Sequence, residues 1–213
     1  MEQIDREFLS GLLPEGVTLI LRESSPSTNS ELRALANDGA AEYTLLVAGR
    51  QTDGHGRQGK PFFSPPDSGA YLSLLLRPAP SDDIAGLVTC AAAVAVAETC
   101  EDVFGVSAGV KWINDIIVNG RKVAGILAEA FDTDGFFVVL GVGANIVAPP
   151  DGFPEGLTIA GAVTDSPPEY ARERFAAGTV TRFLSYFGGG ADAIYEAYAA
   201  RLEYTSYEEV TEN

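Results

Sequence analysis

The chain contains 213 residues, of which 14 are Lys or Arg and 30 are Asp or Glu, so its net charge is −16 at pH 7. A surface this acidic repels nucleic-acid phosphates and anionic lipids, which argues against DNA and against a membrane as partners. With 46% hydrophobic and 21% charged residues, the composition indicates a folded domain and excludes a disordered or fibrous chain.

The first 80 residues predict three strands, one helix and a long loop. Residues 17–22 alternate in polarity and are rich in branched side chains, which predicts a strand. Thr28-x-x-Glu31 is a capping-box pattern and predicts the start of a helix. Strands follow at 43–48 and 71–76. Between them, residues 50–66 hold too many Gly and Pro residues for a regular element and predict a loop.

A long apolar helix is predicted next, capped by Ser81 and ending near Phe104. It is apolar on nearly every side, so we expect it to be buried against a sheet. Its least polar stretch, 84–97, is too short to cross a bilayer, and the first residues lack a signal-peptide pattern. Cys90 and Cys100 would lie about 15 Å apart on this helix, too far for a disulfide. Two reduced thiols predict a soluble, cytoplasmic protein.

Two turn signals then predict three consecutive antiparallel strands. Asn119-Gly120 favours a type I′ turn between strands at 116–118 and 123–127, and Asp134-Gly135 favours a second turn before 136–140. Ser166 is placed to cap a helix over about 167–187, and another helix is expected over about 191–202. Residues 204–213 are strand-like in composition, with no remaining partner in the sequence. The pattern predicts an α+β domain with a mixed, largely antiparallel sheet and helices packed on one face.

Positive charge is concentrated in two short windows. Residues 50–60 and 111–122 hold six of the 14 cations, including all three lysines. The first window contains Gly54-His55-Gly56-Arg57-Gln58-Gly59-Lys60, whose glycines would let backbone N–H groups approach a ligand closely. It matches neither the P-loop nor the dinucleotide fingerprint, and the only histidine, His55, gives no zinc pattern. The windows predict a site for a small anion, although a solvated surface loop is the alternative.

Five motifs resemble those of biotin–protein ligases and occur in that family's order. The loop at 54–60 resembles Gly-Arg-Gly-Arg-x-Gly-Arg, Lys111-Trp112-Ile113-Asn114-Asp115 resembles Lys-Trp-Pro-Asn-Asp, and 122–127 resembles Lys-hydrophobic-Ala-Gly-Ile-Leu. Ser27-Thr28-Asn29 matches the Ser-Thr-Asn that opens the family's catalytic domain, and 141–145 resembles Gly-hydrophobic-Gly-x-Asn. The resemblance implies a monofunctional catalytic domain at 1–203, a short tail at 204–213, and no small C-terminal β domain.

The resemblance also implies a two-step reaction with ATP and Mg²⁺ as co-substrates and biotin as substrate. Biotin and ATP would form biotinyl-5′-AMP and pyrophosphate, and a lysine of a biotin carboxyl carrier protein would then take the biotin and release AMP. No tightly bound prosthetic group is expected. The enzyme would be a monomer or a homodimer.

The positions matching the family's motifs define an implied site. Arg57 would hold the adenylate, and Lys111 would lie where the carboxylate of biotin meets the α-phosphate. Asp115 is a candidate metal ligand, although Asn-Asp before a strand is also ordinary turn chemistry. The implied biotin contacts are Ser27, Thr28, Asn29, Gln51, Gly54, His55, Gly56, Gly125 and Ala144, and the implied nucleotide contacts are Lys60, Phe62, Asn114 and Asn145.

Two other functions stay open at the level of sequence. One is a biotin-binding or regulatory protein that does not transfer biotin, which the apparent lack of the C-terminal domain favours. The other is a lipoate or octanoyl transferase of the same architecture. Retention of Arg57 and Lys111 favours ligation, and the two cationic motifs fit biotin better than lipoate. His55 replaces the family's usual arginine and Ile113 its usual proline.

Overall fold

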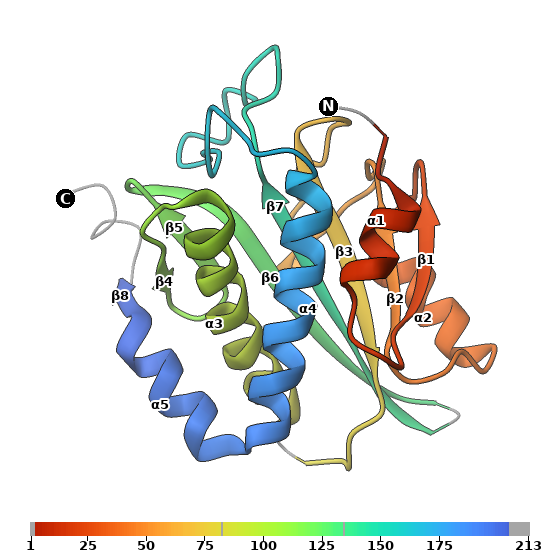
Figure 1. Cartoon of the computed structure of the whole chain (residues 1–213). Helices are drawn as coiled ribbons and strands as arrows, with labels where there is room; N and C mark the ends of the chain where they lie inside the picture. The colour runs from red at the N-terminus through yellow and green to blue at the C-terminus, as the bar shows by residue number, and fades with distance from the viewer. Residues whose placement is uncertain (1–2, 82, 134, 205–213) are drawn as a thin grey trace.

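The computed structural model describes residues 3–81, 83–133 and 135–204, whose strands form one eight-stranded sheet (Figure 1). The strand order is β1-β2-β3-β7-β6-β5-β4-β8. The outer pairs β1–β2 and β4–β8 are parallel and the other pairs are antiparallel, so the predicted mixed, largely antiparallel sheet is confirmed. The strands are β1 Thr18–Arg22, β2 Thr44–Ala48, β3 Gly69–Leu76, β4 Gly109–Lys111, β5 Asp115–Val118, β6 Arg121–Asp132, β7 Phe136–Asn145 and β8 Leu202–Tyr204; the helices are α1 Arg6–Leu12, α2 Thr28–Asn37, α3 Ile84–Phe104, α4 Ala171–Gly189 and α5 Ala191–Arg201, with a short 3₁₀ turn at Arg57–Gly59.

The three consecutive antiparallel strands are present. Asn119 and Gly120 both have positive φ, 50° and 68°, as a type I′ turn requires, and they join β5 to β6. Strands β6 and β7 pair over nine residues of each strand, up to Asp132 opposite Phe136. Asp134 of the second turn signal lies outside the described residues.

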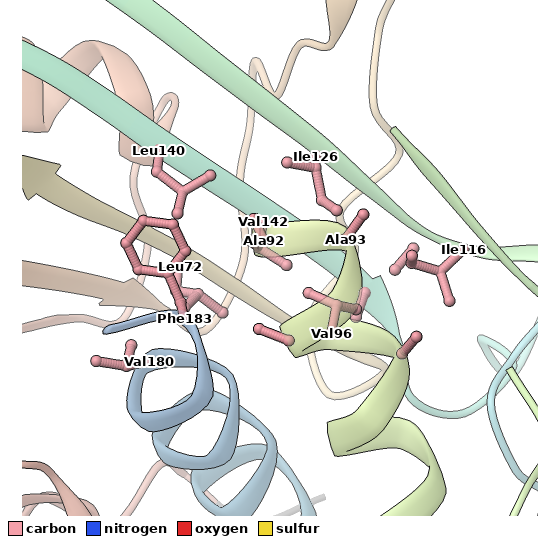
Figure 2. Packing of buried hydrophobic residues seen from close by; sticks show 14 of the residues in the cluster. Leu72, Ala92, Ala93, Val96, Ile116, Ile126, Leu140, Val142, Val180 and Phe183 are labelled. Atoms are coloured by element: carbon pink, nitrogen blue, oxygen red, sulfur yellow. The ribbon is translucent and has the colours of Figure 1, made fainter. Parts of the chain in front are cut away.

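The main core lies between one face of the sheet and helices α3, α4 and α5, as expected. Figure 2 shows Leu140 and Val142 of β7 beside Ala92 and Ala93 of α3 and Phe183 of α4. The alanines of α3 allow its backbone to approach the strands closely. Each large apolar side chain buried here contributes about 1.5–3 kcal/mol relative to exposure, so this layer fixes the strands that carry the site.

Helix α2 packs on the opposite face of the sheet. Leu32 and Ala36 form a second apolar cluster with Leu46, Leu75 and Val139, which point away from the main core because side chains alternate along a strand. Most of the helices are thus on one face of the sheet. Among the described helices, α2 is the one that contributes to the second cluster on the other face. The face of the sheet next to α2 is where the cavity described below opens.

Helix α3 is, within the described part of the chain, the helix long and apolar enough to cross a membrane by length and composition. It spans 21 residues and is therefore longer than the apolar stretch at 84–97 on which the sequence argument was based. Most of the helix is buried against the strands, α4 and α5, which is the setting of a core helix in a globular protein. Its two cysteines are free and buried.

Three predicted helix caps differ from the structure. Ser27, not Thr28, caps α2, and Glu31 turns away to accept hydrogen bonds from Arg22 Nε and Ser25 Oγ at 2.6 and 2.7 Å. Helix α3 starts at Ile84 after Asp83, beyond Ser81. Helix α4 starts at Ala171, four residues later than expected from Ser166 and Pro167. Local cap patterns are weak signals for where a helix starts, because tertiary context overrides them.

The sequence argument missed one short strand at an edge of the sheet and one short helix. Leu202–Tyr204 pairs in parallel with Gly109–Lys111, so the segment at 204 has a partner that is distant in sequence; residues 205–213 lie outside the described residues. Helix α1 was also missed. Asp5 caps it by accepting from Phe8 N at 2.9 Å, and the Phe8 ring stacks on Tyr170 with centroids 4.0 Å apart. Each of these elements is short and depends on a distant partner.

Candidate active site

A cavity of about 720 Å³ brings together most of the predicted site residues. It is bounded by the start of α2, the loop at 50–66, the β4–β5 turn, strands β6 and β7, and residues 153–160. Gly54 and Ala144 are the two predicted site residues absent from its lining. The predicted residues that line it are Ser27, Thr28, Asn29, Gln51, His55, Gly56, Arg57, Lys60, Phe62, Lys111, Asn114, Asp115, Gly125 and Asn145.

One end of the cavity is strongly positive. Its charged lining residues are Arg57, Lys60, Lys111, Lys122 and the single carboxylate Asp115, a formal charge of +3 in a chain of net charge −16. Burial lowers the pKa of the Lys111 ammonium, Asp115 opposes that shift, and the positive charges of Lys122, Arg57 and Lys60 add to it. The four cations therefore act on the same small volume, which suits it to an anion.

The β4–β5 turn and the β5–β6 hairpin assemble this cationic end. Antiparallel pairing places Lys111 opposite Asp115 and brings Lys122 close, with Lys122 Nζ 2.6 Å from Asp115 Oδ1. Arg57 Nη1 donates to Asn114 Oδ1 at 3.4 Å, and Asn114 Nδ2 donates to the carbonyl of Ile126 at 2.9 Å. Asn114 thus ties the glycine-rich loop to the sheet.

Asp115 does not have the surroundings of a metal ligand. Its carboxylate lies 2.6 Å from Lys122 Nζ and 4.0 Å from Lys111 Nζ. Among the described residues, no group of three or more His, Cys, Asp or Glu side chains could hold a metal ion. A carboxylate already neutralised by two ammonium groups does not fit a protein-held Mg²⁺, which seeks negatively charged oxygens. Its evident effect is to hold the two lysines together.

The other end of the cavity is uncharged and polar. Thr28 N donates to Gln51 Oε1 at 2.8 Å, and Gln51 Nε2 donates to Ser64 Oγ at 2.9 Å. Gly54 lies behind this pair: a Cβ there would be 2.9 Å from Gln51 Nε2, Ser64 Oγ and the Phe62 carbonyl. Gly54 therefore acts on the cavity indirectly, because only a residue without a side chain lets the loop lie against Gln51.

An aromatic ring lies over two glycines of the sheet. A Cβ built on Gly143 would be 2.5 Å from Phe62 Cε1, and one on Gly125 would be 3.4 Å from Phe62 Cε2. The two glycines face each other across the β6–β7 pair. They form a flat floor on which the Phe62 ring rests, so a larger residue at 143 would displace the ring into the cavity.

Ala144, which the resemblance placed beside the ligand, does not line the cavity. It is fully buried in the main core with Val142 and Leu140, on the face of β7 opposite to Gly141 and Gly143. Side chains alternate along a strand, so the side chains of residues 143 and 144 point to opposite faces of the sheet. The alternation of apolar residues and glycine at 140–144 in the sequence already predicted that Ala144 shares a face with Leu140 and Val142.

The sequence argument also missed residues that the structure brings to the site. Lys122 was noted as a motif residue but given no role, and it is one of the four cations of the lining. Ser73 and Glu129 lie just behind the lining and hydrogen-bond to Asn29 at 2.6 and 2.8 Å. No local pattern marks these two residues, because their partner is 44 and 100 residues away in sequence.

The sheet and the cavity with one cationic and one polar end are the features by which this chain can be assigned to a class of proteins. Comparison of the sequence with models of known families makes that assignment. Residues 21–145 match the model of the Biotin/lipoate A/B protein ligase family. This match covers more than half of the chain, and the chain belongs to that family.

Within the family, the chain can be compared with individual proteins. The chain is 38% identical to the bifunctional ligase/repressor BirA of Bacillus subtilis over 157 residues, covering 72% of this chain and 48% of BirA. It is 37% identical to the biotin–[acetyl-CoA-carboxylase] ligase of Mycobacterium tuberculosis over 130 residues, covering 59% and 48% of the two chains. The chain spans about half the length of the curated relatives it matches.

Solved structures share the fold. The biotin protein ligase of Aquifex aeolicus in complex with biotin and ATP matches with a TM-score of 0.70 and 25% identity, over 82% of this chain and 72% of that chain. The Leishmania major biotin protein ligase in complex with biotinyl-5-AMP matches with a TM-score of 0.72 and 19% identity, over 89% and 82%. The fold is therefore that of biotin protein ligases, as predicted.

Proposed function

We propose that this protein is an ATP-dependent biotin protein ligase, which forms biotinyl-5′-AMP and transfers biotin to a lysine of a carrier protein. The observation that carries the proposal is that Arg57 and Lys111 line one cavity with the polar group Ser27, Thr28 and Gln51. A ligand with a neutral polar ring at one end and an anionic phosphate at the other matches this arrangement. The relatives named as biotin ligases support the same assignment.

In this proposal the cationic end binds the reacting anions. The biotin carboxylate attacks the α-phosphorus of ATP, a new P–O bond forms, and the bond to the β-phosphate oxygen breaks to release pyrophosphate. Lys111 and Lys122 neutralise the two anions as they approach, and Arg57 holds the adenylate phosphate with its planar guanidinium. Lys60, Asn114 and the neighbouring Asn145 would contact the nucleotide, and Phe62 would offer a ring for the base.

Transfer completes the reaction. The uncharged amine of a carrier lysine attacks the acyl carbon of biotinyl-AMP and the C–O bond to phosphate breaks. The nitrogen gives up one proton to solvent as the amide forms, and AMP leaves with its phosphate charge stabilised by Arg57. Mg²⁺ is assigned to the ATP phosphates as part of the co-substrate, because Asp115 is engaged by lysines. No step of the mechanism passes through a protein-bound metal.

The polar end would bind the ring of biotin. Ser27, Thr28, Asn29 and Gln51 line this end and are buried or half-buried, so they can hydrogen-bond a ligand out of competition with water. Backbone groups of His55 and Gly56 would cover the ligand, and Gly125 would let the Phe62 ring and Lys122 lie close to the sheet beside it. We assign residues 1–203 to the catalytic unit. The cytoplasm is the proposed compartment, in keeping with two buried free thiols.

Pyrophosphate release measures the first step and separates the candidate functions. The purified protein is incubated with ATP and Mg²⁺ and either biotin or lipoate. Release that requires biotin, followed by labelling of a biotin carboxyl carrier domain, is the expected result. Tight biotin binding without pyrophosphate release would replace the proposal with a binding or regulatory function, and release with lipoate alone would replace it with lipoate ligation.

A further inference from the structure

Two exposed aromatic side chains lie at the mouth of the cavity. Among the described residues, four large apolar side chains are exposed, and two of them, Trp112 and Phe63, also line the cavity. Trp112 is the more exposed of the two, at 53%, and it is the only tryptophan of the chain. A residue that lines a cavity while much of its surface is in water stands at the opening. The proposed formation of biotinyl-AMP uses neither of these rings.

Trp112 is held in place from the side of α5 and β8. Its backbone N–H donates to the carbonyl of Tyr204 at 2.8 Å. Its ring meets the buried ring of Tyr198 edge-on, with centroids 6.2 Å apart and planes at 73°. The Tyr198 hydroxyl donates in turn to the carbonyl of Ile113 at 3.1 Å. The indole is therefore positioned before a partner arrives, and binding through it costs little side-chain entropy.

The proposed transfer step requires a second protein at this mouth. A lysine carries its amine on a short flexible stem, so the backbone of the carrier must come up to the rim for the amine to reach biotinyl-AMP. The carrier residues beside the acceptor lysine then lie against the side chains that stand at the opening. Aromatic rings in a fixed position are the usual energetic centres of contacts between proteins.

A nucleotide base is the competing partner for Trp112. The surroundings of the ring favour the carrier, because the contacts that fix it come from α5 and β8, and none of the described residues of these two elements lines the cavity. Phe62, by contrast, lies over the glycine floor inside the cavity. A half-exposed ring fixed to elements outside the cavity suits a partner that covers the mouth.

We infer that Trp112, together with Phe63, is an apolar anchor for the carrier protein and receives apolar side chains that flank the acceptor lysine. This inference rests on the proposed function, because it assigns the contact made in the second step. Trp112 then acts on transfer alone. It raises the affinity for carriers with an apolar residue beside the lysine and leaves the formation of biotinyl-AMP unaffected, so it is a specificity-determining residue outside the reacting groups.

Separate kinetics of the two steps distinguish this role from a structural one. Trp112→Ala should raise the KM for a biotin carboxyl carrier domain about tenfold or more, because truncation removes a central aromatic anchor. Pyrophosphate release in a single turnover without the carrier, and the KM values for biotin and ATP, should stay close to those of the wild type. Trp112→Phe should restore most of the affinity for the carrier, and Phe63→Ala should raise the same KM to a smaller extent.

Leu12 offers a matched control. It is exposed at 40% on α1 and does not line the cavity. Leu12→Ala removes a comparable exposed apolar side chain, so it should leave the KM for the carrier and the release of pyrophosphate unchanged.

A change in the carrier tests the same contact from the other side. The apolar residues beside the acceptor lysine of the carrier domain are replaced by serine. The serine carrier should be a poorer substrate for the wild type by about tenfold, and Trp112→Ala should no longer distinguish the two carriers, because side chains in direct contact have coupled effects.

The fluorescence of Trp112 gives a test that needs no variant, and it stands even if Trp112→Ala fails to fold. Because the chain has a single tryptophan, quenching by acrylamide measures the exposure of this residue alone. A carrier domain without tryptophan should lower the quenching constant about twofold or more, since an anchor residue loses its contact with water. ATP and Mg²⁺ without the carrier should leave the constant unchanged.

The outcomes separate this inference from the proposed function. Protection of Trp112 by ATP alone, or a raised KM for ATP in Trp112→Ala, would assign the ring to the nucleotide and overturn the inference. An unchanged KM for the carrier in Trp112→Ala, or unchanged quenching when the carrier binds, would also overturn it and leave ligation intact. A wild type that neither releases pyrophosphate with biotin nor labels the carrier would overturn the proposed function and the inference together.

Discussion

Gly141 gives the sharpest structural test of the cavity. A Cβ at this position would meet Asn29 Oδ1 and Cγ at 2.2 and 2.8 Å, far inside van der Waals contact. Asn29 cannot simply turn aside, because Ser73 and Glu129 hold both ends of its amide. Gly141→Ala should therefore displace Asn29 and break both hydrogen bonds.

The cost follows from those contacts. Overpacking a filled site costs about 1–3 kcal/mol, and each of the two lost hydrogen bonds costs about 0.5–1.5 kcal/mol, so we expect a loss of about 2–6 kcal/mol in the free energy of unfolding. For a domain of this length, each kcal/mol corresponds to about 2–4 °C in Tm. Thermal and urea unfolding measure the stability, and calorimetry measures the accompanying loss of biotin affinity.

A matched glycine in α4 provides the control. A Cβ on Gly188 has nothing within 4 Å, and Gly188 lies near the end of a helix, where alanine is favoured over glycine. Gly188→Ala should raise the stability by up to about 1 kcal/mol and leave biotin binding unchanged. If Gly141→Ala unfolds within 0.5 kcal/mol of the wild type, on the order of an ordinary surface substitution, the argument about Asn29 is refuted.

Three further predictions concern charge and titration. Lys111→Ala should lower pyrophosphate release about 10²–10³-fold with the fold intact, because one preorganised charge at the reacting phosphate is removed; wild-type release would contradict the role of Lys111. Arg57→Gly should still form adenylate but release it, so that labelling of bystander lysines rises; unchanged selectivity for the carrier would count against Arg57. Burial, assisted by the charge of Asp83, raises the pKa of the Cys90 thiol to about 11, and burial, assisted by Glu101, raises that of Cys100 to about 12. The folded state then keeps protons that the unfolded chain loses from pH 9 upward, so the free energy of unfolding should fall between about pH 9 and 12, and replacement of both thiols by alanine should flatten that fall.

The hairpins, the long apolar helix and the five motifs were predictable because each depends on neighbours in sequence. Asn119-Gly120 specifies its turn through backbone conformations that few other residues adopt, whatever the rest of the chain does. The clustering of the cations in two windows likewise indicated an anion site. The geometry of the site was harder to predict from the sequence. Asn114 and Arg57 meet only because the fold brings the loop and the β4–β5 turn to one end of the sheet.

The sequence by itself determined which chemical groups this protein brings to its cavity. The tertiary structure decided which of these groups face the cavity and which partners they contact there. Ala144 and Gly143 are adjacent in sequence yet face opposite sides of β7, because register and packing choose the buried face. Asp115, readable as a metal ligand, became the partner of two lysines. Ser73 and Glu129 carry no local pattern, and only the sheet brings them to Asn29, because hydrogen-bond direction depends on partners that the fold supplies.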